Sequence, residues 1–478
     1  MLSNDDDGTF RYDAEHYQKK YKRINEILIG KKSSKLISYL KKTVVTGHTP
    51  SMKIDKFYGG DIKFIKTDNV RENKITSSFT DYLTIEGSLE LESSNLKEHD
   101  ILVTIIGATF DIVGRCATIQ KEHLPANINQ NIALIRVDTS KINSNYLSIY
   151  LNTKYGRGSL HYHSRQTEQV NLNCREVERV LVPIFPVLEL KISEVCEKAN
   201  SLIAESKSTY TATETLLLHT LGLANFSPSI EQVNIKSFKD SFGTSGRLDA
   251  EYYQPKYEDY ERFILAYTNG WLPISSICTL KDSNFNPKDD TKYQYIELSD
   301  IDKSGSITGC TTNNGAELPS RARRKVSQGD VLISSIEGSL QSCAIVTSKF
   351  NEALCSTGFY VLSSDKINPE ALLVLFKSEL MQNILKQRCS GTILTAINKN
   401  ELLGIPIPII ESQTQTQIAT LIQQSFTLKA QSEHLLEVAK RAVEIAIEQN
   451  EQAAMDYINV HTSSTSVSYA KPTTATQH

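Results

Sequence analysis

Hydrophobic positions along the chain follow two patterns, and both patterns occur in each half of the chain. Short β-branched runs at 101–106, 132–137, 331–336 and 359–362 are separated by Gly, Asn and Asp, which is typical of strands and turns. Helix-like stretches follow these runs at 144–151 and 369–385. The same order in both halves predicts an α+β protein with two mixed α/β regions.

Two longer segments carry apolar or small residues at alternating spacings of three and four, the seam of a coiled coil. Ser206 and Ser432 occupy equivalent polar gaps in the two seams, at a shift of 226 positions (206 to 432). Because a seam this patchy makes a poor isolated helix, we expect the two helices to pack against each other. The pair is expected to be antiparallel if the halves are related by a pseudo-two-fold axis.

A charged, tyrosine-rich segment also repeats. Residues 11–18 read RYDAEHYQ and residues 247–254 read RLDAEYYQ, a shift of 236 positions (11 to 247). By their pattern the surrounding segments, 10–29 and 246–268, are predicted to be helical. A repeat of this length is a duplication of one large unit, not a short solenoid repeat.

These patterns divide the chain into seven parts. They are an N-terminal helical segment (1–32), a first mixed domain (33–186), a long spacer helix (187–222), a linker with the repeated helical segment (223–269), a second mixed domain (270–411), a second spacer helix (412–456) and a disordered tail (457–478).

Composition places the chain among ordinary globular proteins, with 40% hydrophobic and 22% charged residues. No apolar run approaches the roughly 20 residues that cross a bilayer. The acidic start, MLSNDDD, does not resemble a secretory signal. Eight cysteines form no Cys-x-x-Cys pair, which favours reduced, mostly buried thiols. A cytoplasmic protein is therefore expected.

The net charge of −3 argues against a protein that coats nucleic acid throughout, although local basic faces are still open to phosphate contact. Basic residues cluster near the N-terminus and in the second mixed domain. They are Lys19, Lys20, Lys22, Arg23, Lys31, Lys32, Lys35, Lys41 and Lys42, and then Arg321, Arg323, Arg324 and Lys325. A solvated surface is the alternative interpretation of each run.

Motifs for catalysis are missing from the sequence. The stretch at Gly30–Ser33 lacks the earlier glycine of a phosphate loop. Gly156-Arg157-Gly158 is better interpreted as a helix-ending turn. His161 and His163 have no third ligand at a suitable spacing, so no metal is expected. We find neither a methyltransferase tetrad nor a nuclease pattern, and therefore expect a non-catalytic chain with no cofactor of its own.

Polar and aromatic loops on β scaffolds remain as candidates for function. Arg, Lys, Gln and Asn read base edges in DNA, and Lys, Ser and Thr hold phosphates. The candidate DNA-binding residues are Thr49, Ser51, Lys53, Lys56, Tyr58, Lys66, Arg71, Arg165, Gln166, Asn284, Asn286, Lys292, Tyr293, Arg321, Arg323, Arg324, Lys325, Arg388 and Thr392.

The order of several motifs resembles a known family. The first domain contains Gly47-His48-Thr49-Pro50-Ser51, the stretch Tyr58–Ile65, Asp100–Val103 and Asn129-Gln130-Asn131. Tyr295–Ile301, Gly329–Ser334, Ser356–Phe359 and Ile405–Pro408 play the same parts in the second. Together with the two long helices, this order resembles the specificity (S) subunits of Type I restriction–modification systems, in which each mixed domain is a target-recognition domain.

The resemblance implies a function. Such a subunit binds double-stranded DNA at a two-part, asymmetric target and recruits two methyltransferase (M) subunits and motor–nuclease (R) subunits. Those partners are expected to use S-adenosylmethionine, ATP and Mg, to methylate adenine N6 and to cleave unmodified foreign DNA. The long helices would set the spacing of the half-sites. A stand-alone methyltransferase or nuclease, or a coiled-coil scaffold that binds proteins only, are the alternatives.

The second domain departs from the pattern at one loop. It lacks the Gly-x-Thr-Pro-Ser opening and has Lys281–Pro287 in its place. If loop sequence encodes the target, the two half-sites should differ.

Overall fold

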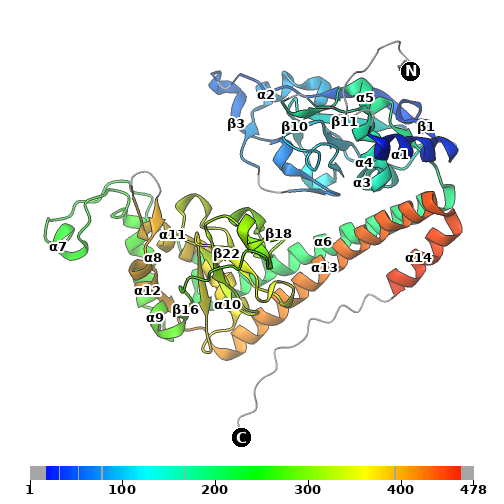
Figure 1. Ribbon diagram of the computed structural model, residues 1–478. Helices are drawn as coiled ribbons and strands as arrows, with labels where there is room; N and C mark the ends of the chain where they lie inside the picture. Colours follow the sequence, from blue (N-terminus) through cyan, green and yellow to red (C-terminus); the bar gives the residue numbers. More distant parts are fainter. Residues whose placement is uncertain are drawn as a thin grey trace, which may run out of the picture. The chain divides into compact units, whose positions relative to one another are not determined.

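The computed structural model describes residues 18–31, 33–51, 53–76, 79–166, 168–391 and 395–463 (Figure 1). These residues form two compact units. Unit 1 takes its described residues from the chain up to Ile203 and from Ala430 onward, and unit 2 is Ala204–Lys429. The long helices α6 (Pro186–Leu221) and α13 (Ser412–Glu448) each contribute one part to either unit.

Unit 1 is built around a four-stranded antiparallel sheet in the order β2-β11-β7-β9. Its strands are β2 (Leu40–Thr46), β7 (Ile101–Thr104), β9 (Cys116–Thr118) and β11 (Ile132–Val137). A second sheet, β10-β3-β6, joins β3 (Tyr58–Ile65) in parallel to β10 (Ala126–Ile128) and antiparallel to β6 (Tyr82–Leu83).

Smaller elements complete unit 1. The strands are β1 (Ser34–Lys35), β4 (Val70–Arg71), β5 (Lys74–Ile75), β8 (Ile106–Gly107), β12 (Arg165–Gln166), β13 (Val170–Asn171) and β14 (Leu181–Val182). The helices are α1 (Lys19–Gly30), α2 (Ile85–Leu89), α3 (Ser144–Asn152), α4 (Lys154–His163), α5 (Cys174–Glu178) and α14 (Glu451–Ser463).

Unit 2 repeats this topology. Its four-stranded sheet has the order β16-β23-β20-β21, and a second sheet has the order β18-β17-β22-β19 with a parallel β17–β22 pair. The strands are β15 (Trp271–Pro273), β16 (Thr279–Leu280), β17 (Lys292–Ile296), β18 (Thr311–Asn314), β19 (Ala322–Lys325), β20 (Val331–Ser334), β21 (Cys343–Ile345), β22 (Leu354–Ser356), β23 (Phe359–Ser363), β24 (Cys389–Ser390), β25 (Ala396–Ile397) and β26 (Pro406–Pro408).

The helices of unit 2 outside the long pair are α7 (Phe242–Ser245), α8 (Pro255–Leu265), α9 (Ile274–Ile277), α10 (Pro369–Lys377), α11 (Glu379–Arg388) and α12 (Lys399–Gly404). The strand orders of the two four-stranded sheets correspond one to one. The predicted internal repeat of two mixed domains and the α+β class are therefore confirmed.

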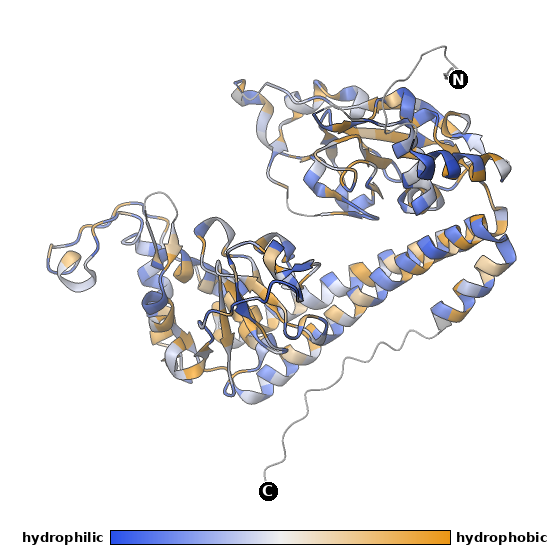
Figure 2. Cartoon of the chain, in the orientation of Figure 1, coloured by the Kyte–Doolittle hydropathy of each residue, from blue (hydrophilic) through white to orange (hydrophobic). Residues whose placement is uncertain are grey.

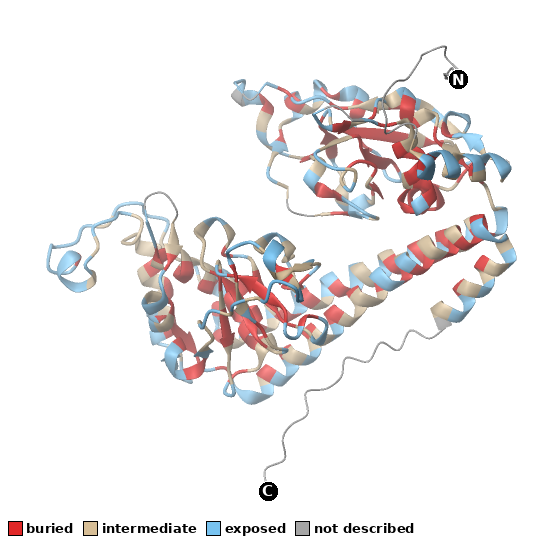
Figure 3. Ribbon diagram, in the orientation of Figure 1, coloured by how far each residue is buried: buried red, intermediate tan, exposed pale blue. Residues whose placement is uncertain are grey.

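In each unit, alternate side chains of the central strand face the helices on one side of the central sheet and the second sheet on the other. Ile101 and Val103 of β7 pack with the helices, whereas Leu102 packs toward the second sheet. In unit 2, Val331 and Ile333 of β20 face the helices and Leu332 faces the second sheet. Because successive side chains of a strand point to opposite faces, one buried strand holds both layers together. Figure 3 shows the burial concentrated on these strands and helices.

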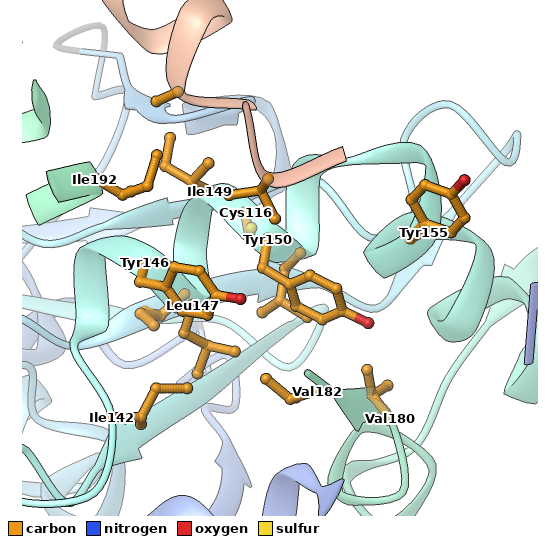
Figure 4. Packing of buried hydrophobic residues seen from close by; sticks show 14 of the residues in the cluster. Cys116, Ile142, Tyr146, Leu147, Ile149, Tyr150, Tyr155, Val180, Val182 and Ile192 are labelled. Carbon is orange, nitrogen blue, oxygen red and sulfur yellow. The ribbon is translucent and has the colours of Figure 1, made fainter. Parts of the chain in front are cut away.

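Helix α3 anchors the sheet of unit 1 to the segment that leads into α6. Asn143 caps the helix by accepting from the backbone N–H groups of Asn145 and Tyr146. The Tyr146 hydroxyl donates to the Pro183 carbonyl at 2.8 Å, and the Tyr150 hydroxyl donates to the Leu181 carbonyl. Figure 4 shows both tyrosines among the buried aliphatic side chains of this cluster.

The long helices pack against each other within each unit. In unit 1 the Ser432 hydroxyl donates to the Ala199 carbonyl at 2.7 Å. In unit 2 the Ser206 hydroxyl donates to the Ser425 carbonyl at 2.8 Å. Among the seam positions that the 3-and-4 spacing predicts, the buried ones include Ile192, Ala199, Ile418, Leu435, Ala439 and Ala442. The predicted positions Leu202, Leu216, Leu421 and Leu428 are only half-buried. Figure 2 shows hydrophobic segments alternating with hydrophilic ones along both helices.

One expectation is wrong in the repeated tyrosine-rich segment. Residues 247–254 form turns, and the helix starts only at Pro255. The residue before a proline avoids the helical conformation, and Gln254 has φ −58 and ψ 135, outside the helical region. The Arg247 guanidinium also binds the Asp249 carboxylate, a pairing two residues apart that a helix does not offer. The first copy, 11–17, lies outside the described residues.

Four other features of the secondary structure differ from the predictions. The stretch 369–385 is two helices, because Ser378 ends α10 and its side chain caps α11. Gly156 and Gly158 lie inside α4 and not in a turn; a Cβ on Gly156 would stand 2.2 Å from the Tyr150 carbonyl oxygen. The second spacer helix ends at Glu448, and α14 makes 457–463 helical where a disordered tail was expected. Residues 464–478 lie outside the described residues.

All eight cysteines are free, and most are buried. Burial raises the pKa of Cys116 to about 12 and the pKa of Cys343 to about 11. These thiols are therefore protonated and unreactive at neutral pH, in agreement with the prediction.

Candidate nucleic-acid interface

The loop that follows β2 in unit 1 is held by the turn after β10. The Thr49 hydroxyl donates to the Gln130 side-chain oxygen at 2.6 Å. Gly47 lies so close to the Ile128 carbonyl oxygen that an added Cβ would stand 1.7 Å from it. Only glycine fits this approach, so the backbone of the loop is fixed while Ser51 and Lys53 remain exposed.

Tyr58 and Lys66 have structural partners in the same region. The Tyr58 hydroxyl donates to the Pro50 carbonyl at 2.7 Å, and burial followed by the charge of Asp81 raises the pKa of Tyr58. The Lys66 ammonium lies 2.5 Å from the Asp81 carboxylate and lowers the pKa of that carboxyl by hydrogen bonding. Lys56, in contrast, is exposed and lies 5.3 Å from the Phe57 ring centroid.

In unit 2 the second sheet brings several predicted residues onto one surface. We call it the unit 2 basic face and define it by Phe285, Asn286, Tyr293, Arg323 and Lys325. The Phe285 backbone N–H donates to the Arg323 carbonyl at 2.7 Å, and Arg323 Nη1 donates to Asn286 Oδ1 at 2.7 Å. Loop 281–287, which stands where unit 1 has its Gly-x-Thr-Pro-Ser sequence, is therefore held against β19.

Aromatic and cationic side chains alternate across this face. The Phe285 ring lies edge-on to Tyr293 at 5.8 Å between centroids, and Lys325 Nζ lies 5.5 Å from the Phe285 centroid. Lys325 also pairs with Glu352. Cations interleaved with aromatic rings offer both charge and stacking surface to a nucleic acid.

Further candidates lie at the rim of the unit 2 basic face. Asn284, Lys292 and Arg321 are exposed, and the structure gives their side chains no hydrogen-bond or ion-pair partner among the described residues. Arg324, next to Arg323 on β19, is partly buried. Its Nε and Nη1 atoms are buried without a partner in the described part of the chain.

Two predicted arginines are committed to internal contacts. Arg165 Nε donates to the buried Glu176 carboxylate at 2.9 Å. Arg388 Nη2 donates to Glu261 at 2.8 Å, and its Nη1 donates to the Tyr252 hydroxyl at 2.9 Å. Arg388 thus links the repeated tyrosine-rich segment to α11, so we no longer propose it as a DNA-binding residue.

The remaining predicted residues are dispersed. Arg71 is exposed on β4. The exposed basic residues of α1 are Lys19, Lys20, Lys22 and Arg23. Gln166 contributes its backbone to β12. Thr392 lies outside the described residues.

Sequence reasoning did not single out two groups of residues. Strand β18 places Thr311, Thr312, Asn313 and Asn314 alongside β17, and their amide- and hydroxyl-rich run was a usable signal. Arg115 and Arg157 are far apart in sequence, yet both guanidinium groups donate to the Asp111 carbonyl oxygen. Only the fold brings those two together.

Neither a metal-binding group nor a membrane-spanning helix is found among the described residues. Within 18–463, gaps aside, no group of three or more His, Cys, Asp and Glu side chains is arranged to hold a metal ion. His161 is buried, and its Nε2 contacts the Val113 carbonyl at 3.1 Å. The helices that the structure describes include none long and apolar enough to span a membrane.

Comparison with known proteins gives a family match, which lies in the second half of the chain. The model of the Type I restriction modification DNA specificity domain matches residues 273–438. The specificity subunit of the Type I restriction enzyme EcoBI from Escherichia coli is 25% identical over 154 residues, which cover 31% of this chain and 31% of that subunit. The match thus spans about a third of that relative's length.

Two solved structures are also similar. The S subunit of a Type I restriction–modification system from M. genitalium is 11% identical, with 89% of this chain and 95% of that chain covered at a TM-score of 0.39. The HsdS subunit from Thermoanaerobacter tengcongensis is 13% identical, with 87% and 96% covered at a TM-score of 0.29.

The family match begins at the last residue of β15 and ends within α13, so it contains both sheets of unit 2 and the unit 2 basic face. Residues 273–438 of this chain thus match the Type I restriction modification DNA specificity domain.

Proposed function

We propose that this chain is the specificity subunit of a Type I restriction–modification enzyme, in which each unit reads one part of a bipartite, asymmetric DNA target. The observation that carries the proposal is the contrast between scaffold and loops. The central four-stranded sheets of the two units have the same strand order. The side chains displayed beside those sheets differ.

The contrast is sharpest at equivalent loops. After β2, unit 1 displays Ser51, Lys53 and Lys56 on a loop held by Thr49 and Gln130. After β16, unit 2 displays Asn286, which is hydrogen-bonded to Arg323 of β19. Hydroxyl, amide and guanidinium groups read different base edges in the major groove, so unlike loops select unlike half-sites.

Catalysis, on this proposal, belongs to other subunits. Methyltransferase subunits would supply S-adenosylmethionine-dependent N6-adenine methylation, and motor–nuclease subunits would supply ATP- and Mg-dependent cleavage. Because the target adenine would be flipped into the active site of a methyltransferase subunit, this chain would only position the enzyme on DNA. The relatives' names support the specificity role, and the partners are part of the proposal.

The test is a map of N6-methyladenine in host DNA with the gene intact and with the gene deleted. We expect one two-part asymmetric sequence to lose methylation in the deletion strain and to regain it on complementation. An unchanged methylation map would contradict the proposal. A purified chain that methylates or cuts DNA alone would show instead that it is an enzyme.

A further inference from the structure

Three arginines of unit 1 come together where the hairpin β4–β5, the loop before β9 and helix α4 meet. Arg115 Nε donates to the Asp111 carbonyl oxygen at 2.8 Å, and Arg157 Nη2 donates to the same oxygen at 2.9 Å. One acceptor atom therefore holds two guanidinium groups within a few ångströms of each other. Arg71, at the end of β4, brings a third positive charge to the group.

Few negative charges offset this cluster. Within the described chain, Glu72 is the carboxylate that reaches ion-pair distance of any of the three arginines, 3.4 Å from Arg157 Nη1. Glu72 is shared with Lys440 of α13, which lies 3.5 Å from it. A carboxylate divided between two cations at these distances neutralises neither fully.

The neighbouring positive charges affect the pKa of Arg115. Burial, followed by the charges of Arg71 and Arg157, lowers the pKa of Arg115, while Glu72 and Asp111 act in the opposite direction. Like charges held together without full compensation are unfavourable in the free protein, and an incoming anion relieves the repulsion. Guanidinium groups are suited to this role because their forked donors match the oxygens of a phosphate.

The backbone is adapted to bring the side chains together. Gly114 has φ +87, and a Cβ there would stand 3.2 Å from a Leu160 methyl group and 3.3 Å from Arg157 Cδ. A larger residue would be strained in this conformation and would push Arg157 away from Asp111. The cluster is therefore specified by a glycine as well as by the arginines.

We infer that Arg71, Arg115 and Arg157 form a binding site for a backbone phosphate of double-stranded DNA. The inference rests on the proposed function and adds to it a contact in unit 1 that does not read sequence. Such contacts fix the register of a protein on the duplex and make binding depend on salt.

The test measures binding of the full chain to a fluorescein-labelled duplex that lacks the methylated sequence, by anisotropy at several salt concentrations. Arg71→Gln and Arg115→Gln should each weaken binding several-fold and reduce the slope of log K against log salt by about 0.9. Arg115→Lys keeps the charge and should keep most of the slope. Arg262→Gln, which removes an exposed arginine of unit 2, is the matched control.

The outcomes separate this inference from the proposed function. If the wild-type chain binds the duplex and the Arg71 and Arg115 variants bind it with unchanged affinity and slope, the phosphate site is wrong and the specificity role stands. If the variants lose binding to a single-stranded RNA but not to the duplex, the site is also wrong. A wild-type chain that binds no duplex contradicts both. Arg71 is exposed, so its variant stays informative if Arg115→Gln unfolds.

Discussion

The side chains of Ser206 on α6 and Ser425 on α13 exchange reciprocal hydrogen bonds: Ser206 Oγ donates to the Ser425 carbonyl at 2.8 Å, and Ser425 Oγ donates to the Ser206 carbonyl at 2.9 Å. A shift of 226 positions carries Ser206 onto Ser432 and carries Ala199 onto Ser425. The Ser432–Ala199 bond of unit 1 is thus the repeat-related copy of the Ser206–Ser425 bond of unit 2. The same kind of contact between α6 and α13 therefore occurs once in each unit.

The buried serines should stabilise the helix pair measurably. Ser206→Ala removes the hydroxyl that bonds Ser425, and we expect a loss of about 1 kcal/mol in the free energy of unfolding of unit 2. Urea unfolding followed by circular dichroism measures the change. Ser208→Ala, at an exposed position of the same helix, should be neutral or slightly stabilising because alanine favours helix. Equal effects of the two substitutions would contradict the role given to Ser206.

Each unit also contains a buried aspartate that begins its central strand. The Asp100 carboxylate accepts from Arg136 at 2.6 and 2.7 Å and from the Lys97 backbone N–H at 2.7 Å. Asp330 in unit 2 accepts from Lys281 at 2.7 Å and from the Ser327 backbone N–H at 2.8 Å. The carboxylate is thus common to both units, whereas its cation comes from β11 in unit 1 and from the residue after β16 in unit 2.

Asp100→Asn should therefore destabilise unit 1 by about 3 kcal/mol, because it leaves the largely buried Arg136 without its counter-ion. Thermal unfolding of the full chain gives the measurement. Asp61→Asn, on an exposed position of β3, makes the same chemical change and should have little effect. A melting temperature unchanged by Asp100→Asn would show that the pair does not stabilise the unit.

His161 makes the stability of unit 1 depend on pH. It is 8% exposed and lies against the Phe110 and Tyr21 rings at centroid distances of 5.1 and 5.7 Å. Burial lowers the pKa of His161 to about 4 from 6.5. The unfolded chain takes up a proton near pH 6.5 and the folded chain does not, so stability is full above pH 6.5 and falls as the pH drops toward 4.

At pH 5 the loss from this group is on the order of 2 kcal/mol. His161→Gln should reduce the difference in urea midpoint between pH 7 and pH 5, whereas His219→Gln, at an exposed position of α6, should leave that difference unchanged. The same difference in wild type and His161→Gln would exclude His161 as the group responsible.

The repeated tyrosine-rich segment should be needed for folding and not for DNA contact. Arg247 lies 4.3 Å from the Tyr252 ring centroid and donates to the Cys389 carbonyl at 2.7 Å, and Arg388 holds the Tyr252 hydroxyl from the other side. Arg388→Ala should lower the free energy of unfolding by roughly 2 kcal/mol, since it leaves Glu261 unpaired. Duplex affinity, measured below the unfolding temperature, should match wild type. A large loss of affinity in a folded variant would show that Arg388 contributes to DNA binding.

Periodicity was sufficient to predict the scaffold. The β-branched runs at β7 and β11 and the seam of α6 and α13 are buried on the faces that alternation and 3-and-4 spacing indicate. Local chemistry that competes with periodicity was harder to predict. Ser378 ends a helix inside a continuous apolar stretch, and Pro255 with the Arg247–Asp249 pair replaces a predicted helix by turns.

The candidate site was predictable only where it is local in sequence. Loop 281–287 and β19 each carry a recognisable run, and the fold joins them through Asn286 and Arg323. Whether a cation is free or paired depends on residues far away in sequence. Arg388 with Glu261, Arg165 with Glu176, and the meeting of Arg115 with Arg157 all arise from tertiary contacts.

The central claim is that two units with one scaffold and unlike loops read two unlike half-sites. Its most direct test compares Lys53→Ala with Asn286→Ala on duplexes that carry the methylated sequence, in which either half is intact or scrambled. We expect each substitution to cost roughly 1–3 kcal/mol of binding through one half only, a different half for each variant. Scrambling that half should abolish the difference from wild type. Equal losses on both halves, or losses of both variants through the same half, would contradict the account.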